Sequence, residues 1–454
     1  MVKGKIMTEE LLFYGQGKDV ELLDALTGAT TPGAYRKAAG DLFSMAAERG
    51  YRGNLWHCYL TNILLLSENP YSIAAERRGA VEGTLSEAVM RDLKVMRDLF
   101  YYPFDEKEEA LGIKVPIAKH FKAFISDGSE GLRYSNKVAD AICHLADDLS
   151  KSFEIIDFKR KLDDFYAKYG VGMMGLHKAF RVDREESKLK INPIFHIAVT
   201  SLDDLVGYEI PKAKLVANTE AFLAGREANN CLIFGEAGTG KSSSIRALLN
   251  TYYDKGLRMI EVYKHQYKEL NDLIDSLKRR NYRFVIYMDD LSFEEFETDY
   301  KYLKAVIEGG LESRPDNVLI YATSNRRHLV RENYTDREEG ANDKHSTETM
   351  QEKLSLYSRF GETIYFGAPT HQEYEEIVKE LARRYEIPLT EKELLAEANK
   401  WEIQHGGVSG RTARHFIDAM RAKYCVAKEE KETSEVIDKA AEQKKEMEEK
   451  SGEL

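Results

Sequence analysis

The residues best suited to chemistry form a loop pattern, GEAGTGKS, at positions 235–242. It stands between an apolar run, CLIF, and a helix-like segment, SSSIRALLNTYY. In that context glycines let successive backbone N–H groups turn toward a phosphate, and the start of the following helix adds partial positive charge. The pattern predicts a nucleotide-phosphate site made of Gly235, Glu236, Ala237, Gly238, Thr239, Gly240, Lys241, Ser242 and Ser243.

Within this loop the side chains have distinct expected tasks. Lys241 is expected to reach the β- and γ-phosphates, and the Ser242 hydroxyl is expected to be a ligand of Mg²⁺. A second metal ligand should come from the end of a neighbouring strand. The segment FVIYMDD supplies Asp289 there, directly after an apolar run. The expected metal ligands are therefore Ser242 and Asp289.

The next carboxylate, Asp290, is placed to polarise a water molecule that attacks the γ-phosphate. Glu294 and Glu295, in the segment SFEEFE, would be substitutes if that loop folds back. The sequence leaves open which carboxylate does this and whether hydrolysis takes place.

These residues need a scaffold that brings strand ends together, and the second half of the chain predicts one. Short apolar runs alternate there with helix-like segments, which is typical of a parallel sheet covered on both faces. The expected strands are CLIF (231–234), LRMIEV (257–262), FVIYM (284–288), NVLIYAT (317–323) and TIYFG (363–367). The predicted fold class is α/β.

The chain divides into four expected parts. Residues 1–200 are mostly helical, because apolar residues recur there at intervals of three and four, with a candidate hairpin over 180–194. Residues 201–368 form the α/β core, and residues 369–426 form a compact helical appendix. Residues 427–454 are a charged tail with almost no apolar side chains.

Composition sets limits on the class of protein. The chain has 66 Lys plus Arg against 77 Asp plus Glu, a net charge of -11, which argues against a surface wrapped in nucleic acid. Part of this acidity lies in the tail, so a local basic groove stays open. Four cysteines stand far apart in the sequence, and no apolar run approaches the ~18 residues of a membrane span. We expect a cytoplasmic protein without a membrane segment.

Three later motifs extend the pattern in an order that resembles an AAA+ ATPase. Asn325, in YATSNRRHL, resembles the sensor that orients the attacking water, although such an Asn can also cap a turn. Arg359, in LYSRFG, resembles the arginine finger that enters a neighbouring subunit's site; alone it would suit a surface ion pair. Arg411, in SGRTARHF, resembles the lid sensor, with Arg414 as second choice.

More specifically, the chain is similar to an uncharacterised bacterial group of AAA+ proteins, filed as a domain of unknown function. The motifs that carry this likeness are GTGKSS, DDLSFE, ATSNRRHL, LYSRFG and SGRTARHF. The resemblance implies a parallel five-stranded P-loop core with a helical lid, preceded here by a mostly helical N-terminal domain. It also implies ATP and Mg²⁺ as cofactors, with the adenine near LVGYE (205–209).

The function that this resemblance implies has two forms. In the first, ATP hydrolysis drives remodelling or loading of a macromolecular partner; in the second, the protein is a nucleotide-gated scaffold with little or no hydrolysis. Asp290 replaces the Glu of many AAA+ relatives, although the group itself reads DD. A finger acting in trans implies a homo-oligomer, and the N-terminal domain would carry an unknown protein partner.

Three further patterns are weaker. GVGMMG (170–175) matches a dinucleotide fingerprint by letter, but it follows a helix, so we expect a flexible turn. KRRNYR (278–283) and the arginines at 383–384 would suit nucleic acid, or solvated helix ends. Tyr263 and Tyr267 follow the second core strand without the glycine that a threading loop would carry.

Overall fold

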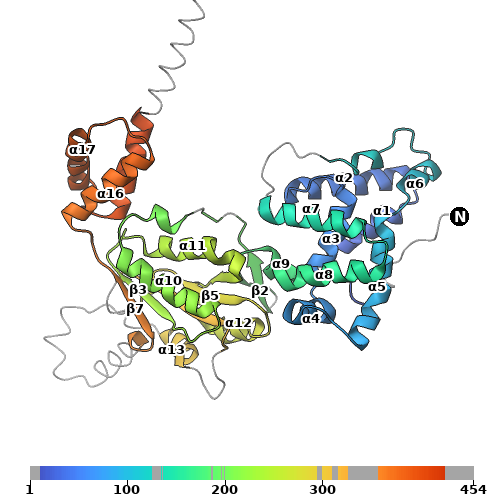
Figure 1. Cartoon of the computed structure of the whole chain (residues 1–454), viewed down its shortest axis with the longest axis horizontal. Coiled ribbons are helices and arrows are strands. Elements are labelled where there is room, and N and C mark those ends of the chain that lie inside the picture. The colour runs from blue at the N-terminus through green and yellow to red at the C-terminus, as the bar shows by residue number, and fades with distance from the viewer. Residues whose placement is uncertain are drawn as a thin grey trace, which may run out of the picture.

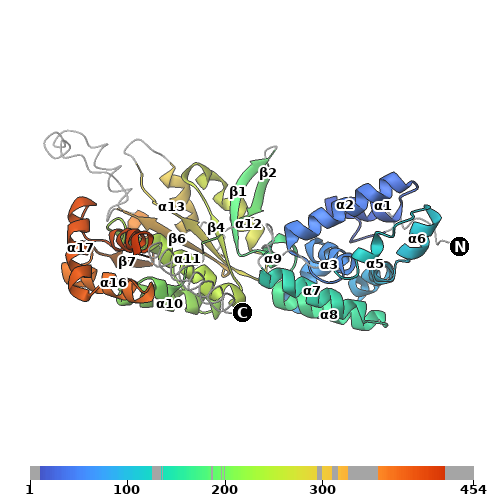
Figure 2. The ribbon, with the colours of Figure 1, turned by 90° about the horizontal axis from the view of Figure 1, so that it is seen from above.

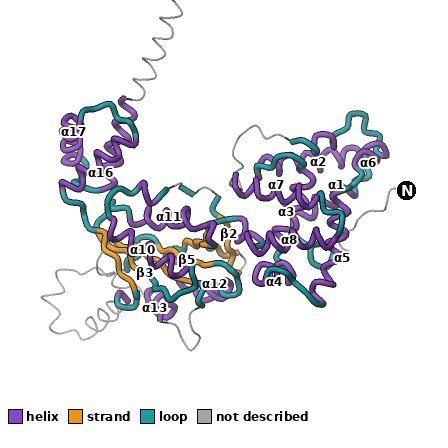
Figure 3. The backbone as a smooth tube through the Cα atoms, viewed as in Figure 1, coloured by secondary structure: helices purple, strands orange, loops and turns teal. Residues whose placement is uncertain are grey.

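The computed structural model describes residues 11–124, 134, 136–185, 188–195, 197–198, 200–293, 299–308, 315–325 and 356–424. Along its longest axis the molecule has a helical N-terminal half, a sheet covered by helices, and a smaller helical unit at the other end (Figures 1 and 2). Figure 3 shows that the strands are confined to the middle region. The predicted α/β fold class is confirmed.

The helical half has its own core, built mainly from helix faces. Its helices are α1 (Lys18–Thr27), α2 (Pro32–Arg49), α3 (Leu55–Leu66), α4 (Pro70–Arg78), α5 (Thr84–Phe100), α6 (Phe104–Ala110), α7 (Asn136–Ser150), α8 (Ile155–Tyr169) and α9 (Gly172–Leu176). Side chains at the N-caps set where several begin: Thr31, Asn54 and Asn69 each accept a hydrogen bond from a backbone N–H of the first turn. Buried tyrosines, among them Tyr14 and Tyr166, fill the space between helices.

The sheet has seven strands in the order β2-β1-β4-β5-β6-β3-β7. The strands are β1 (Ala179–Glu185), β2 (Lys188–Pro193), β3 (Cys231–Gly235), β4 (Leu257–Glu261), β5 (Arg283–Met288), β6 (Val318–Ser324) and β7 (Glu362–Phe366). The five predicted strands, β3 to β7, are parallel to their neighbours. The hairpin expected over 180–194 also forms, but it extends this same sheet, because β1 pairs in parallel with β4.

Helices cover both faces of the sheet, as buried parallel strands require. On one face, α10 (Glu209–Leu223) and α11 (Lys241–Tyr252) pack on alternate strand residues such as Ile233 and Val285. On the other face, α12 (Leu270–Leu277) and α13 (Tyr300–Glu308) pack on the residues between them, such as Leu232 and Phe284. The short segment η5 (Lys264–Glu269) connects β4 to α12. Of the two tyrosines there, Tyr267 is buried and Tyr263 is exposed.

The helical appendix begins after β7 and forms a third core. It consists of α16 (His371–Arg384), α17 (Glu391–Gln404) and a helix over 410–424. Thr370 with Glu373 and Thr390 with Glu393 form capping boxes that start the first two helices. Its core includes Tyr374, Leu394 and Phe416. Arg383 and Arg384 at the end of α16 both pair with Glu380.

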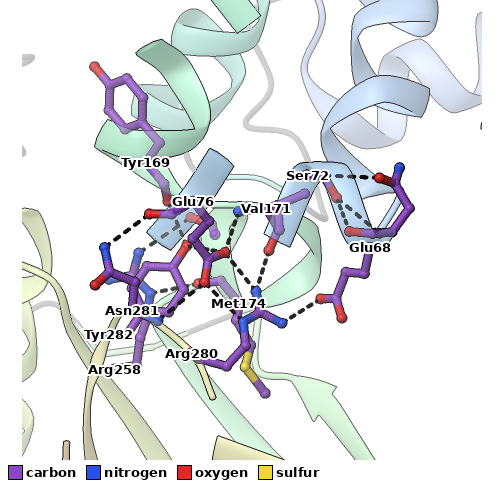
Figure 4. Close-up of polar contacts among 12 residues, drawn as sticks. Glu68, Ser72, Glu76, Tyr169, Val171, Met174, Arg258, Arg280, Asn281 and Tyr282 are labelled. Atoms are coloured by element: carbon purple, nitrogen blue, oxygen red, sulfur yellow. Dashed lines mark hydrogen bonds and ion pairs between the residues drawn. The ribbon is translucent and has the colours of Figure 1, made fainter. Parts of the chain in front are cut away.

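A buried ion-pair cluster, which we call the joint, connects the helical half to the sheet (Figure 4). Glu76 at the end of α4 accepts hydrogen bonds from Arg280 Nε and Nη2 at 3.1 and 2.9 Å and from the backbone of Val171 at 2.9 Å. Arg280 Nη1 also pairs with Glu68 at 3.0 Å. The Glu76 side chain is 1% exposed and that of Arg280 is 7% exposed. Arg280 is thus neither a solvated helix end nor part of an exposed basic patch.

The segment GVGMMG is the second component of the joint, and the expectation of a flexible turn was wrong. It is mostly buried and includes α9. Gly170 has φ 88°, and a Cβ there would lie 1.1 Å from the hydroxyl of Tyr282. Behind this contact, Arg258 Nε donates to the Met174 carbonyl at 2.7 Å. The glycine permits close contact between the halves of the molecule rather than contact with a dinucleotide.

Two findings concern the expectations from composition. Within the described part of the chain, no helix combines the length and apolar character that crossing a membrane requires. Cys58, Cys143 and Cys231 are free thiols, whereas Cys425 lies outside the described residues. Although far apart in sequence, Cys58 and Cys143 come within 3.3 Å, sulfur to sulfur.

Candidate nucleotide site

The loop 235–242 joins the end of β3 to the start of α11, as the sequence pattern predicts. Gly235, Gly238 and Gly240 have positive φ values of 135°, 77° and 90°. A Cβ at Gly235 would lie 2.0 Å from the carbonyl oxygen of Phe366, so β7 can run close beside the loop only because no side chain is present. The remaining loop residues, Glu236, Ala237 and Thr239, complete the turn, with the Thr239 hydroxyl donating to the Glu236 carbonyl at 2.8 Å.

Lys241 is folded back over this loop. Its Nζ donates to the carbonyls of Gly235 and Glu236 at 2.9 and 2.6 Å, and the residue is 6% exposed. Burial lowers the pKa of Lys241, and the nearby carboxylates of Asp290 and Glu236 act against that shift. The ammonium group is therefore desolvated, and phosphate oxygens could replace the two carbonyls as its acceptors.

Ser242 and Asp289 lie together beside the loop, as expected of two ligands of one cation. Ser242 Oγ donates to Asp289 Oδ1 at 2.7 Å. Burial would raise the pKa of Asp289, but hydrogen bonds from Thr323 and Ser242 outweigh it, so the pKa is lowered. Asp289 is thus ionised at neutral pH, and a serine hydroxyl beside a carboxylate is the oxygen donor set that suits Mg²⁺. Ser243, the last predicted loop residue, lies one position further along α11.

Asp290 and Asn325 also come together. Asn325 Nδ2 donates to Asp290 Oδ1 at 2.9 Å. These side chains follow β5 and β6, whose carboxyl ends lie side by side in the parallel register Met288↔Ala322. Asp290 has φ 50°, an unusual value for a residue other than glycine. Glu294 and Glu295, the substitutes considered for Asp290, lie outside the described residues.

Thr323 connects the Asp289 carboxylate to the backbone of Asp290, and the sequence analysis missed it. Its buried hydroxyl donates to Asp289 Oδ1 at 2.6 Å and accepts a hydrogen bond from the Asp290 backbone N–H at 2.9 Å. The signal was present in the TSN tripeptide, where Thr323 is two residues before Asn325. Alternation in β6 could not show that this hydroxyl reaches across to β5.

The helical appendix contacts the phosphate loop through the start of its last helix. The Arg411 backbone N–H donates to the Gly238 carbonyl at 3.0 Å. A Cβ at Gly238 would come within 3.0 Å of Arg411 Cβ and 3.1 Å of Ser409 Oγ. Arg414 instead pairs with Asp418 and lies over the ring of Tyr385, within the appendix. Of the two candidate lid sensors, the structure brings Arg411 to the loop.

The segment 205–209 lies where the loop, the sheet and the appendix meet. Leu205 would contact a Cβ at Gly240, and Gly207 has the side chain of Ile377 beside it. Tyr208, with φ 60°, stacks on Phe366 at 5.4 Å. These contacts put mainly apolar groups next to the phosphate loop, as an adenine ring requires.

Arg359 follows a short helical turn and precedes β7. Leu356 and Phe360 anchor this turn in the core beneath α13, while Arg359 is half-buried. The contacts described for this single chain do not bring Arg359 to the phosphate loop. A role in a neighbouring subunit's site therefore remains a prediction.

Comparisons with known proteins locate the similarity in this region. A family model described as "Protein of unknown function (DUF815)" matches residues 175–424. No curated protein matches the chain. Similar solved structures include the Thermotoga maritima RuvB Holliday junction branch migration motor, at 18% identity and a TM-score of 0.34. A point variant of the same RuvB protein matches at 18% identity and a TM-score of 0.36. Each alignment covers 50% of this chain and 66% of the other, just under two thirds.

Proposed function

Because the chain belongs to the family described as "Protein of unknown function (DUF815)" and has an AAA+ P-loop fold, we propose that it binds and hydrolyses ATP with Mg²⁺. The observation that carries this proposal is the 2.7 Å contact between Ser242 and Asp289 beside the buried amine of Lys241. A phosphate-binding lysine and two adjacent oxygen ligands are the minimum that a Mg²⁺–nucleotide site needs.

The chain's own residues have separable tasks in this proposal. Lys241 and the loop N–H groups would bind the phosphates, while Ser242 and Asp289 would hold Mg²⁺, which when bound neutralises phosphate charge. Asp290 and Asn325 would orient a water molecule, and their mutual hydrogen bond of 2.9 Å supports a shared task. Thr323 would hold the Asp289 carboxylate and the Asp290 backbone in place.

The helical appendix would act as a lid over the nucleotide. Its backbone contact from Arg411 to Gly238 supports this, because any change of loop shape on binding phosphate would move the lid helix. The Arg411 side chain would then stabilise γ-phosphate charge, and the segment 205–209 would contact the adenine.

Completion of the site would require a second copy of the chain. We assign Arg359 as the finger that a neighbouring subunit supplies in trans, so the active form would be a homo-oligomer. A macromolecular partner would bind the helical half, and ATP turnover would remodel or load it.

Single-turnover ATP hydrolysis over a series of protein concentrations tests this proposal. The rate per subunit should rise with concentration, vanish in Lys241→Ala and fall by about 1000-fold in Arg359→Ala. Arg383→Ala, which removes an exposed lid arginine paired with Glu380, should leave the rate unchanged. Concentration-independent hydrolysis that survives Arg359→Ala would refute the trans finger.

A nucleotide-gated scaffold is the second candidate, and the geometry of Asp290 favours it. This carboxylate is one methylene shorter than Glu, and its backbone has φ 50°. Tight ATP binding without turnover, unchanged by Asp290→Glu, would support the scaffold. A gain in turnover from Asp290→Glu would support the hydrolase.

Partner capture should use the full chain as bait. Residues 179–193 pair with β4, so a bait that ended after the hairpin would expose unpaired strands. A bait that ended at residue 178 would leave Glu76 buried without Arg280. Release of the proteins that the full chain retains should depend on ATP if the proposal is correct.

A further inference from the structure

A cavity of about 330 Å³, which we call the junction cavity, lies between the helical half and the joint. One wall comes from the helical half, with Asp19, Arg49 and Ile63. The opposite wall comes from the segments that enter and leave the hairpin, with Met173, His177 and Phe195. Its volume is at the lower end of the ~300–1,000 Å³ typical of small-molecule sites. It is separate from the phosphate loop, because none of its lining residues belongs to that site.

Arg49 is a buried guanidinium with more donors than acceptors. It is 4% exposed, and its Nη2 donates to both carboxylate oxygens of Asp19, at 2.9 and 3.1 Å. Its Nε and Nη1 make no hydrogen bond of good geometry within the described residues, although the Tyr51 hydroxyl lies close enough to interact with the guanidinium. Buried donors of a charged group rarely stay unpaired in folded proteins. The fold therefore leaves part of Arg49 to be satisfied by something in the cavity.

His177 supplies a second open polar position. It is 6% exposed, and within the described residues its Nε2 has no hydrogen-bond partner. Its ring contacts those of Tyr134 and Phe195, each at a centroid distance of 5.3 Å. Burial, together with the nearby charge of Arg258, lowers the pKa of His177 to about 4, so the ring is uncharged at neutral pH.

We propose that the junction cavity binds an uncharged aromatic heterocycle of nucleobase size, whose acceptor atoms bond to Arg49 and His177. Asp19 already balances the charge of Arg49, so an anionic ligand would bring an uncompensated charge into the protein. Ring nitrogens and carbonyl oxygens are good acceptors for a guanidinium, as in its contacts with base edges. Aromatic and apolar walls accept the faces of such a ring.

Because of the position of this cavity, a bound ligand would affect the stability of the protein. Met173 lies in α9, which carries the joint, and His177 directly follows it, whereas Asp19 and Arg49 belong to α1 and α2. A ligand that contacts both walls would stabilise the joint. Its binding should therefore raise the thermal stability of the full chain as well as give a direct binding signal.

Ligand-observed NMR titrations of the full-length protein test the proposal, with uracil and hypoxanthine as uncharged probes and benzoate as a charged ring. We expect both heterocycles to bind and benzoate not to bind. His177→Phe, which keeps the ring but removes Nε2, and Arg49→Met should each weaken binding by about tenfold, the loss of one good hydrogen bond. Arg49→Met leaves Asp19 without its ion-pair partner. If the Arg49→Met protein does not fold, His177→Phe alone tests whether the cavity binds the heterocycle.

Two control variants separate this site from others. Arg52→Met removes an exposed arginine three residues away, which pairs with Asp140, and should not alter binding. Lys241→Ala should not alter it either, because the P-loop is a different site. The proposal is overturned if neither heterocycle binds, if His177→Phe binds as well as the wild type, if only Lys241→Ala abolishes binding, or if benzoate binds equally well.

Discussion

At the scale of single residues, Thr323 organises the part of the site that contains Asp289 and Asp290. Its hydroxyl group donates to the Asp289 carboxylate and accepts from the backbone N–H of Asp290, so it fixes the first side chain and the backbone that carries the second. The same hydrogen bond lowers the pKa of Asp289 against the effect of burial. An uncharged residue thus helps to keep Asp289 ionised and sets the direction of its carboxylate.

Thr323→Val should leave the fold intact but damage the site. Without the hydroxyl, Asp289 loses one of its donors, so half-maximal ATPase activity should require more Mg²⁺, and turnover should fall by about tenfold or more. A magnesium titration of ATP turnover measures both. Thr251→Val, which removes a hydroxyl bonded only within α11, is the matched control. Equal magnesium dependence in Thr323→Val and wild type would contradict this assignment.

His177 should make stability depend on pH. Its pKa is about 4 in the folded protein and 6.5 when exposed, so the unfolded chain binds the proton more readily. Stability should therefore be complete above pH 6.5 and decline as the pH falls toward 4, by up to about 3 kcal/mol. Denaturation at pH 7.5 and pH 5 should show a smaller loss in His177→Phe than in wild type. An equal loss of stability in both proteins would show that other groups dominate the pH dependence.

At the scale of elements, the joint depends on a glycine whose absent side chain makes room. Gly170 ends α8, and the hydroxyl of Tyr282 occupies the position its Cβ would take while donating to the Tyr169 carbonyl at 3.0 Å. Gly79 ends α4 with a similar φ of 75° but has nothing within 4 Å of its Cβ position. A comparison of substitutions at the two glycines therefore separates the cost of a positive φ from the cost of a steric clash.

Gly170→Ala should therefore cost more than Gly79→Ala. Both substitutions impose a positive φ on alanine, worth about 1 kcal/mol. Only Gly170→Ala also displaces Tyr282, so its total loss in the free energy of unfolding should reach about 3 kcal/mol. Chemical denaturation of the full chain compares them. Similar losses in the free energy of unfolding in the two variants would mean that Tyr282 can move away from residue 170 at little cost.

At the scale of the whole molecule, β5 spans the distance between the joint and the nucleotide site. Arg280, Asn281 and Tyr282 precede the strand and bind the helical half, whereas Asp289 follows its other end. The lid contacts the phosphate loop on the far side of the sheet (Figure 1). The helical half thus contacts the residues before β5, whereas the helical appendix contacts the phosphate loop.

A fragment that begins at residue 175 should be less stable and less soluble than the full chain. It keeps the whole sheet and the phosphate loop but leaves Arg280 without Glu76, Glu68 and Val171, and Arg258 without the Met174 carbonyl. Breaking such buried pairs costs about 3–5 kcal/mol, so we expect a lower melting temperature and aggregation. Arg280→Met within the fragment should partly restore solubility. A fragment as stable as the full chain would show that the joint contributes little.

The sequence by itself determined the phosphate loop, the five parallel strands, the hairpin and the end of β5 at Asp289. Each depends on consecutive residues, because a glycine pattern, an apolar run or an alternation with the period of a strand specifies the local backbone. It also set the order of the motifs, which is why the α/β fold class with a helical lid could be predicted.

Only the tertiary structure decided which distant groups meet. It brought Thr323 to Asp289, Arg411 rather than Arg414 to the loop, and the hairpin to the edge of β4. It also showed that GVGMMG, which matches a dinucleotide fingerprint by letter, is part of the joint. These outcomes depend on contacts between residues far apart in the chain, where burial and steric exclusion act on side chains that local patterns cannot place.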